Sequence, residues 1–146
     1  MSRVHQHLIK SEYPSWFIAE DDLDDQCLMN EALGEIEVPC SQVRFSGDGV
    51  QLLEQLRSEA ERPCIVILDL NMPTMDGWEA LSIIKNDEKL KMLPIIILTT
   101  SKEQSDINRA YENGVNSYFS KPSRFSDLKE IVKVINRYWM RNAKTG

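Results

Sequence analysis

Two short runs of apolar residues, at Cys64–Leu68 and Ile95–Leu98, constrain the fold of this chain more than any other feature of its sequence. Unbroken runs of this length, rich in β-branched residues, are typical of strands covered on both faces, whereas half-exposed strands alternate apolar and polar residues. Strands covered on both faces occur mainly in parallel sheets flanked by helices. The two runs therefore predict a parallel sheet in the middle of the molecule.

Strand and helix patterns alternate along the rest of the chain. Shorter apolar segments at Trp16–Ala19, Val43–Phe45 and Ser117–Phe119 predict three further strands. Each strand is followed by a segment whose apolar residues recur at spacings of three and four, which indicates a helix. The last helix has the clearest apolar stripe, formed by Leu128, Ile131, Val132, Ile135, Tyr138 and Trp139. Five strand-then-helix units predict an α/β fold with a doubly wound, five-stranded parallel sheet.

Length and composition fit one domain. The chain has 146 residues, of which 42% are hydrophobic, and a formal net charge of −6. We expect a flexible N-terminal segment over residues 1–13, one domain over 14–141 and a short tail over 142–146.

The same composition argues against several functions and locations. The acidic balance disfavours nucleic-acid binding through bulk charge, and no apolar run approaches the ~20 residues that span a bilayer. The N-terminus lacks the features of a secretory signal. Three sparse cysteines are expected to be small buried residues in a reducing compartment. We therefore expect a cytoplasmic protein without membrane association.

Polar residues follow the strand ends and are candidates for the functional site. Glu20 and Asp21 follow the first strand, Asp69 the third, Thr99 the fourth and Lys121 the fifth. Ligands of open parallel sheets bind outside the carboxyl ends of the strands, so these side chains are expected to meet. Clustered carboxylates repel unless a cation shares their site, and oxygen-only ligands suit Mg²⁺ or Mn²⁺ rather than zinc. Such a site would bind a phosphoryl group, with an aspartate as nucleophile.

Four segments of the chain carry a resemblance to a known family. They are FIAEDD at 17–22, LDLNMPTMDG at 68–77, LTT at 98–100 and YFSKP at 118–122. In this order they resemble the receiver domains of two-component response regulators, over about residues 14–140. The resemblance implies the flavodoxin-like receiver fold with strand order 2-1-3-4-5.

The resemblance also implies the metal site and the phosphorylation site. Asp69 resembles the phosphoacceptor. Glu20, Asp21, Asp69 and the backbone carbonyl of Asn71 resemble the ligands of Mg²⁺. Lys121 resembles the lysine that pairs with the phosphoryl group, and the peptide that follows it is often cis in the family.

Further positions resemble residues that respond to phosphorylation. Thr99 resembles the hydroxyl that binds a phosphoryl oxygen and then shifts. Tyr118 resembles the aromatic switch residue that turns inward after this shift. Asn71 and Ser101 flank the site and are expected to tune the lifetime of the phosphoryl group.

Four further acidic residues lie close to these positions in the sequence. Asp22 either faces the metal or caps the following helix, and the sequence leaves both alternatives open. Asp24 and Asp25 are expected to be solvated, and Asp76 is expected to be a turn residue beside Gly77.

The predicted function is that of a single-domain response regulator, which is not an enzyme beyond a slow loss of its own phosphoryl group. The expected donor is a histidine kinase or a phosphotransfer protein. Only Arg141–Gly146 follow the last helix, so we expect no DNA-binding output and a downstream protein contact instead. The alternatives are a phosphorelay intermediate and, remotely, a Mg²⁺-dependent aspartyl phosphohydrolase, although Asn71 stands where such enzymes carry an aspartate.

The aromatic end of the last helix also resembles single-domain regulators that partner phytochrome-type kinases. That resemblance implies a homodimer through the surface of the fourth helix, fifth strand and fifth helix.

Overall fold

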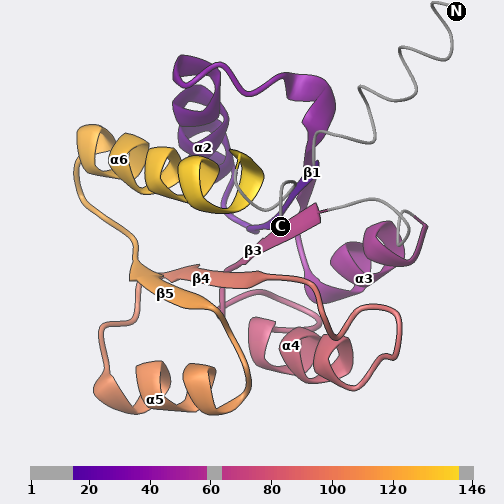
Figure 1. The fold of residues 1–146 in the computed structure, drawn as a ribbon. Helices are drawn as coiled ribbons and strands as arrows, with labels where there is room; N and C mark the ends of the chain where they lie inside the picture. The colour runs from indigo at the N-terminus through magenta and orange to yellow at the C-terminus, as the bar shows by residue number, and fades with distance from the viewer. Residues whose placement is uncertain (1–14, 59–63, 142–146) are drawn as a thin grey trace, which may run out of the picture.

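The computed structural model describes residues 15–58 and 64–141 and contains the predicted parallel sheet with helices on both faces (Figure 1). The predicted segment 1–13 and tail 142–146 lie outside the described residues. The strands are β1 (Ser15–Ala19), β2 (Val43–Ser46), β3 (Cys64–Leu68), β4 (Ile95–Thr99) and β5 (Ser117–Ser120). The helices are α2 (Leu23–Glu35), α3 (Gly49–Ser58), α4 (Gly77–Lys85), α5 (Gln104–Glu112) and α6 (Phe125–Ile135). A 3₁₀ turn at Cys40–Gln42 precedes β2, and a π-helical segment at Asn136–Arg141 continues α6.

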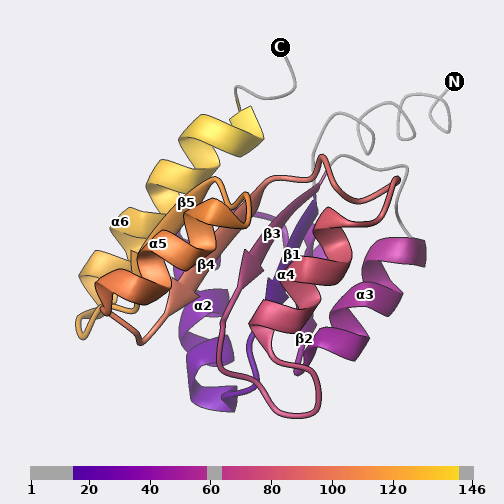
Figure 2. The ribbon, with the colours of Figure 1, turned by 90° about the horizontal axis from the view of Figure 1, so that it is seen from below.

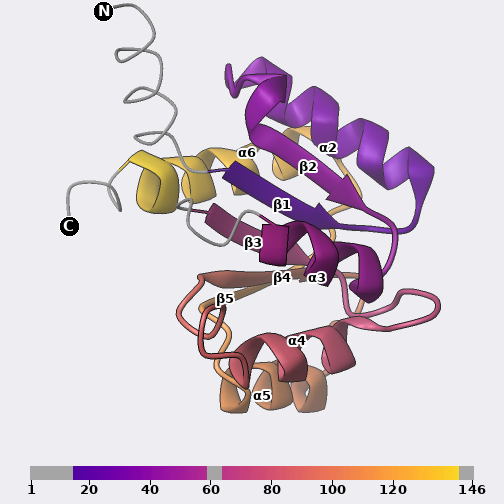
Figure 3. The same cartoon turned by 90° about the vertical axis from the view of Figure 1, so that its right-hand side faces the viewer.

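The strand order is β2-β1-β3-β4-β5, and all neighbouring strands are parallel, as Figure 3 shows for the strands nearest the viewer. This order confirms the predicted fold class. Ala19 pairs with Leu68, and Thr99 pairs with Ser120. The register therefore brings the residues that follow β1, β3, β4 and β5 to one edge of the sheet.

The core has two layers because successive residues of each strand point to opposite faces. Phe17 packs toward α3, α4 and α5, whereas Trp16 and Ile18 pack toward α2 and α6. Figures 1 and 2 show these two groups of helices on opposite faces of the sheet. The central strands are covered on both sides, which explains the unbroken apolar runs of β3 and β4.

The last helix ends with one aromatic side chain against the core and one in solvent. Leu128, Val132 and Ile135 are buried, but Tyr138 is 62% exposed. The chain changes from α-helix to π-helix at Asn136. The wider turn shifts the phase of the side chains, so that Trp139 reaches the core while Tyr138 turns outward.

Two cysteines also depart from the prediction. Cys27 and Cys40 are exposed and have free thiols, so the expectation of buried side chains was wrong for both. Cys27 lies on the outward face of α2, and Cys40 lies in the 3₁₀ turn before β2. None of the helices in the described part of the chain is both long enough and apolar enough to cross a bilayer.

Candidate functional site

Three carboxylates meet at the carboxyl edge of the sheet. Oxygen atoms of Glu20, Asp21 and Asp69 lie within 4.8 Å of one another. Glu20 and Asp69 are buried, whereas Asp21 is exposed. The Asp69 N–H donates to the Ala19 carbonyl at 3.1 Å, and the Glu20 N–H donates to the Ser46 carbonyl at 2.9 Å. These bonds extend the pairing of the strands by one residue and fix where the two buried carboxylates lie.

Lys121 lies among these carboxylates. Its ammonium nitrogen is 3.0 Å from Asp69 Oδ2 and 2.5 Å from Glu20 Oε1. The Lys121 backbone N–H donates to the Thr99 carbonyl at 2.7 Å, which continues the pairing of β4 with β5. The structure thus brings four predicted residues together, with Lys121 in contact with two of the three carboxylates. They are Glu20, Asp21, Asp69 and Lys121. Contrary to the expectation from the resemblance, the peptide after Lys121 is trans, since the described residues contain no cis peptide.

Asp25 also contacts Lys121, and this contact was not predicted from the sequence. Its Oδ2 atom lies 2.8 Å from the Lys121 ammonium nitrogen, so the prediction of a solvated Asp25 was wrong. The sequence left open whether Asp22 faces the metal or caps the helix. In the structure Asp22 Oδ1 accepts from the backbone N–H groups of Asp24 and Asp25 at 2.8 and 3.1 Å. Asp22 is therefore the N-cap of α2, and its cap places Asp25 in the first helical turn.

Thr99 supplies a buried hydroxyl without a partner. The residue is 0% exposed, and its Oγ1 has no hydrogen-bond partner among the described residues. Burying a hydroxyl without a hydrogen bond costs about 1–3 kcal/mol. An oxygen of a bound anion would remove this cost, so the position fits the predicted contact with a phosphoryl group.

Ser101 connects the loop after β4 to β5 and to α5. Its carbonyl accepts from the Tyr118 hydroxyl at 3.0 Å and from the Ser120 hydroxyl at 3.2 Å. Its own hydroxyl donates to Asp106 Oδ2 at 2.6 Å. Tyr118, the predicted switch residue, is half-buried and is hydrogen-bonded to the loop that follows Thr99.

The loop between β3 and α4 closes tightly on Asp69. The Asn71 N–H donates to Asp69 Oδ1 at 3.2 Å, while the predicted role of the Asn71 carbonyl stays a prediction. A Cβ atom on Gly77 would lie 2.3 Å from the Asp69 carbonyl oxygen, so a glycine is required there. Asp76 is the N-cap of α4 and accepts from the Glu79 N–H at 2.9 Å. This agrees with the prediction that Asp76 is a turn residue.

Burial and charge shape the protonation of the site. Burial raises the pKa of Glu20 to about 7, against the opposing effect of its hydrogen bond with Lys121. Burial alone would lower the pKa of Lys121, but its hydrogen bonds with Asp25, Glu20 and Asp69 outweigh burial and raise it. Three carboxylates thus contact one ammonium, and the Asp21 carboxylate lies beside two of them. This excess of negative charge and the all-oxygen donor set fit a hard divalent cation such as Mg²⁺ or Mn²⁺.

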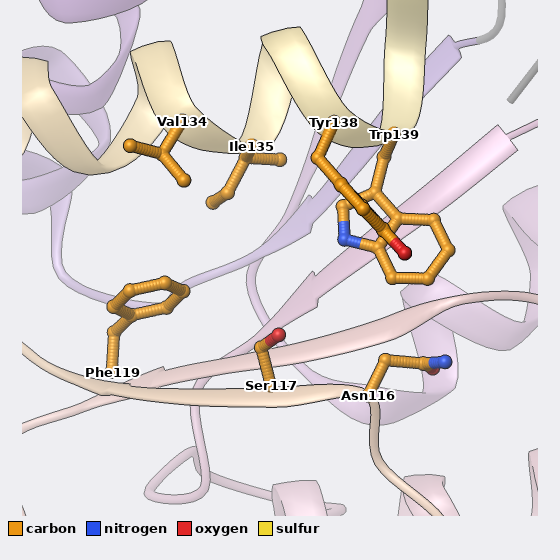
Figure 4. A pocket seen from close by; sticks show the side chains of 7 residues that line it. All are labelled: Asn116, Ser117, Phe119, Val134, Ile135, Tyr138 and Trp139. Carbon is orange, nitrogen blue, oxygen red and sulfur yellow. The ribbon is translucent and has the colours of Figure 1, made fainter. Parts of the chain in front are cut away.

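A groove lies at the other end of β5 from Lys121. It has a volume of about 470 Å³ and lies between β5 and α6, where the rings of Tyr138 and Trp139 stand over the start of the strand (Figure 4). These rings meet edge to face with centroids 4.8 Å apart. The lining residues are Asn116, Ser117, Phe119, Val134, Ile135, Tyr138 and Trp139.

Comparison with known proteins places this geometry in a family. The family described as "Response regulator receiver domain" matches residues 17–133. Response regulator Rcp1 of Synechocystis sp. is 33% identical over 128 residues, which are 84% of this chain and 86% of Rcp1. The probable methanogenesis regulatory protein FilR2 of Methanothrix harundinacea is 43% identical over 102 residues, covering 67% of this chain and 66% of that relative.

Solved structures agree with the sequence comparisons. The phosphorylated cyanobacterial phytochrome response regulator RcpA superimposes with a TM-score of 0.78 at 38% identity, over 87% of this chain and 94% of RcpA. The Mn²⁺-bound form of Rcp1 gives 0.76 at 30% identity, over 88% and 96% of the two chains. The protein therefore belongs to the family of response regulator receiver domains.

Proposed function

We propose that the protein accepts a phosphoryl group on Asp69 from a partner histidine kinase, with Mg²⁺ or Mn²⁺ as cofactor, and signals through protein contact. One observation carries this proposal. The buried Asp69 carboxylate lies 3.0 Å from the Lys121 ammonium and in a cluster with two further carboxylates. A nucleophile, an ammonium and a cluster of oxygen ligands are the groups that phosphoryl transfer to a carboxylate requires.

The transfer step follows from the position of Asp69. A carboxylate oxygen of Asp69 attacks the phosphorus of a phosphohistidine, so that an O–P bond forms as the P–N bond breaks. The electron pair of the broken bond stays on the imidazole nitrogen, which takes up a proton. Glu20, Asp21, Asp69 and the Asn71 carbonyl would hold the divalent cation, which supplies positive charge opposite the phosphoryl oxygens when bound.

Phosphorylation changes the contacts of Lys121 and Thr99, and then those of Tyr118. The Lys121 ammonium, which contacts Asp69 Oδ2, pairs with the phosphoryl oxygens instead. Thr99 Oγ1, which has no partner among the described residues, donates to one of these oxygens. Tyr118 then leaves the Ser101 carbonyl and turns inward. We assign the tuning of phosphoryl lifetime to Asn71 and Ser101, because one contacts Asp69 and the other lies in the loop after Thr99.

The output surface consists of α5, β5 and α6, which correspond to the fourth helix, fifth strand and fifth helix of the sequence prediction. Tyr118 lies on β5, so its movement changes the strand between the two helices. This shift between two states would promote a homodimer or contact with a downstream protein. The likeness to the cyanobacterial phytochrome response regulator RcpA supports a phytochrome-type kinase as the donor. A role as phosphorelay intermediate uses the same chemistry.

Intact-mass spectrometry with acetyl phosphate tests the proposal. Incubation of the protein with acetyl phosphate and Mg²⁺ is expected to add one phosphoryl mass, and EDTA is expected to prevent the addition. Asp69→Asn is expected to abolish it, whereas the control Asp76→Asn, which alters an exposed helix cap, is expected to retain it. A phosphoryl mass that persists in Asp69→Asn would overturn the assignment.

A further inference from the structure

The Lys121 ammonium is shared by three carboxylates in the structure. Its nitrogen atom lies 2.5, 2.8 and 3.0 Å from one oxygen each of Glu20, Asp25 and Asp69. A lysine ammonium has three donors and no acceptor, so these contacts satisfy it fully. Any new anion that binds Lys121 must therefore displace one of the three carboxylates.

Asp25 differs from the other two partners of Lys121. Glu20 and Asp69 belong to the cluster of carboxylates that can hold a metal ion, and Asp25 does not. Asp25 lies in the first turn of α2, where its backbone N–H is held by the Asp22 cap. Its side chain is 37% exposed, whereas the side chain of Lys121 is 16% exposed. Asp25 thus holds Lys121 from the solvent side, from an element that the phosphoryl site does not otherwise use.

We propose that Asp25 is a positioning residue that holds the Lys121 ammonium for phosphoryl transfer and competes with the phosphoryl group for it. This inference rests on the function proposed above. If Glu20 and Asp69 bind a divalent cation, the Lys121 ammonium loses them as partners, and Asp25 remains as its ion-pair partner. When a phosphoryl group arrives, Lys121 must exchange the Asp25 carboxylate for phosphoryl oxygens.

The proposal predicts effects of opposite sign on two ligands. Without the Asp25 carboxylate, Lys121 stays on Glu20 and Asp69 and competes with the cation, so Mg²⁺ binds more weakly. Once Mg²⁺ is saturating, the phosphoryl oxygens no longer compete with Asp25, so a phosphoryl mimic binds more tightly. We expect each dissociation constant to change about twofold to fivefold, the range for a partly exposed ion pair.

Asp25→Asn tests this inference, with Asp24→Asn as the matched control. Both variants remove one negative charge from the first turn of α2, but only Asp25 contacts Lys121. Calorimetric titration measures the affinity for Mg²⁺ alone, and ¹⁹F NMR measures the affinity for beryllofluoride at saturating Mg²⁺. Asp25→Glu restores the charge on a side chain longer by one methylene, and Asp25→Ser provides a second neutral variant. Circular dichroism verifies that each variant is folded.

The inference expects Asp25→Asn and Asp25→Ser to weaken Mg²⁺ binding and to tighten beryllofluoride binding. Asp24→Asn is expected to change neither beyond a small charge effect, and Asp25→Glu is expected to move both constants back toward wild type. Equal changes of the two dissociation constants in Asp24→Asn and Asp25→Asn would overturn the inference. Weaker binding of both Mg²⁺ and beryllofluoride by Asp25→Asn would overturn it as well. A wild-type protein that binds no beryllofluoride would overturn the proposed function as well, so the two failures are distinguishable.

Discussion

The α-carbon of Gly77 lies against the backbone carbonyl of Asp69, so close that a Cβ atom would be 2.3 Å from the carbonyl oxygen. The Gly77 N–H also donates to the Leu70 carbonyl at 3.0 Å. These contacts join the first residue of α4 directly to the backbone of the predicted phosphoacceptor. The position of the Asp69 carboxylate therefore depends on a glycine eight residues later in the chain.

Gly77→Ala is expected to lower the free energy of unfolding by about 1–3 kcal/mol, because the added methyl group must push the Asp69 backbone aside. It is also expected to slow phosphorylation by acetyl phosphate. Gly34→Ala is the control, since no other atom of the described residues lies within 4 Å of a Cβ added there, and alanine favours the helix by up to about 1 kcal/mol. Denaturant unfolding measures both variants, and equal stability of the two would contradict the close approach.

Tyr118→Phe is expected to lower the free energy of unfolding by about 1 kcal/mol, since it removes the hydrogen bond to the Ser101 carbonyl. If Tyr118 leaves Ser101 on activation, this loss applies only to the unphosphorylated state. Beryllofluoride should then bind the variant about fivefold more tightly, because the same free energy no longer opposes activation. Tyr111→Phe alters an exposed tyrosine and is expected to leave both values unchanged. Weaker beryllofluoride binding by Tyr118→Phe would contradict the proposed switch.

In EDTA, the stability of the protein is expected to fall with rising pH because of Glu20. Burial raises the pKa of Glu20 from 4.5 to about 7, so between these values the folded protein binds more protons than the unfolded chain. The free energy of unfolding therefore decreases as pH rises through this window. Glu20→Gln imitates the protonated side chain, so the difference in the free energy of unfolding between this variant and wild type should grow in favour of the variant as pH rises from 5 to 8. Urea unfolding at several pH values measures the difference, and parallel pH profiles would contradict a raised pKa.

Beryllofluoride is expected to convert the protein from monomer to dimer through the surface of α5, β5 and α6. Val134 of α6 is 53% exposed beside the groove between β5 and α6. Val134→Glu is expected to keep the protein monomeric, because dimerisation would bury the added charge. Val50→Glu alters an exposed valine of α3 on the other face and is expected to leave the dimer intact. Sedimentation with and without beryllofluoride measures this, and an unchanged sedimentation coefficient of the wild type would count against dimerisation.

The sheet and most of the site could be predicted from sequence because both depend on local patterns. The apolar runs of β3 and β4 predict that these strands are covered on both faces, and the structure confirms the fold and the strand order. Residues that follow parallel strands meet at one edge whatever the details of the loops. The structure accordingly brings Glu20, Asp21, Asp69 and Lys121 together.

The features that could not be predicted from sequence depend on contacts between distant segments and on the local helix geometry. Asp25 looks like an ordinary acidic residue at a helix start. Its contact with Lys121 arises only because the Lys121 side chain reaches from the residue after β5 to the first turn of α2. The pattern that would have pointed to it is its place one turn after the Asp22 cap. Tyr138 fits an α-helical stripe, and only the change to a π-helix at Asn136 turns it outward.

Chemical trapping identifies the residue that carries the phosphoryl group. The protein is phosphorylated with acetyl phosphate and Mg²⁺ and reduced with borohydride, which converts an aspartyl phosphate to homoserine, and its peptides are then sequenced by mass spectrometry. We expect homoserine at position 69 alone, and none when EDTA replaces Mg²⁺. Homoserine at another aspartate, or its absence from position 69 in a protein that has gained the phosphoryl mass, would contradict this account.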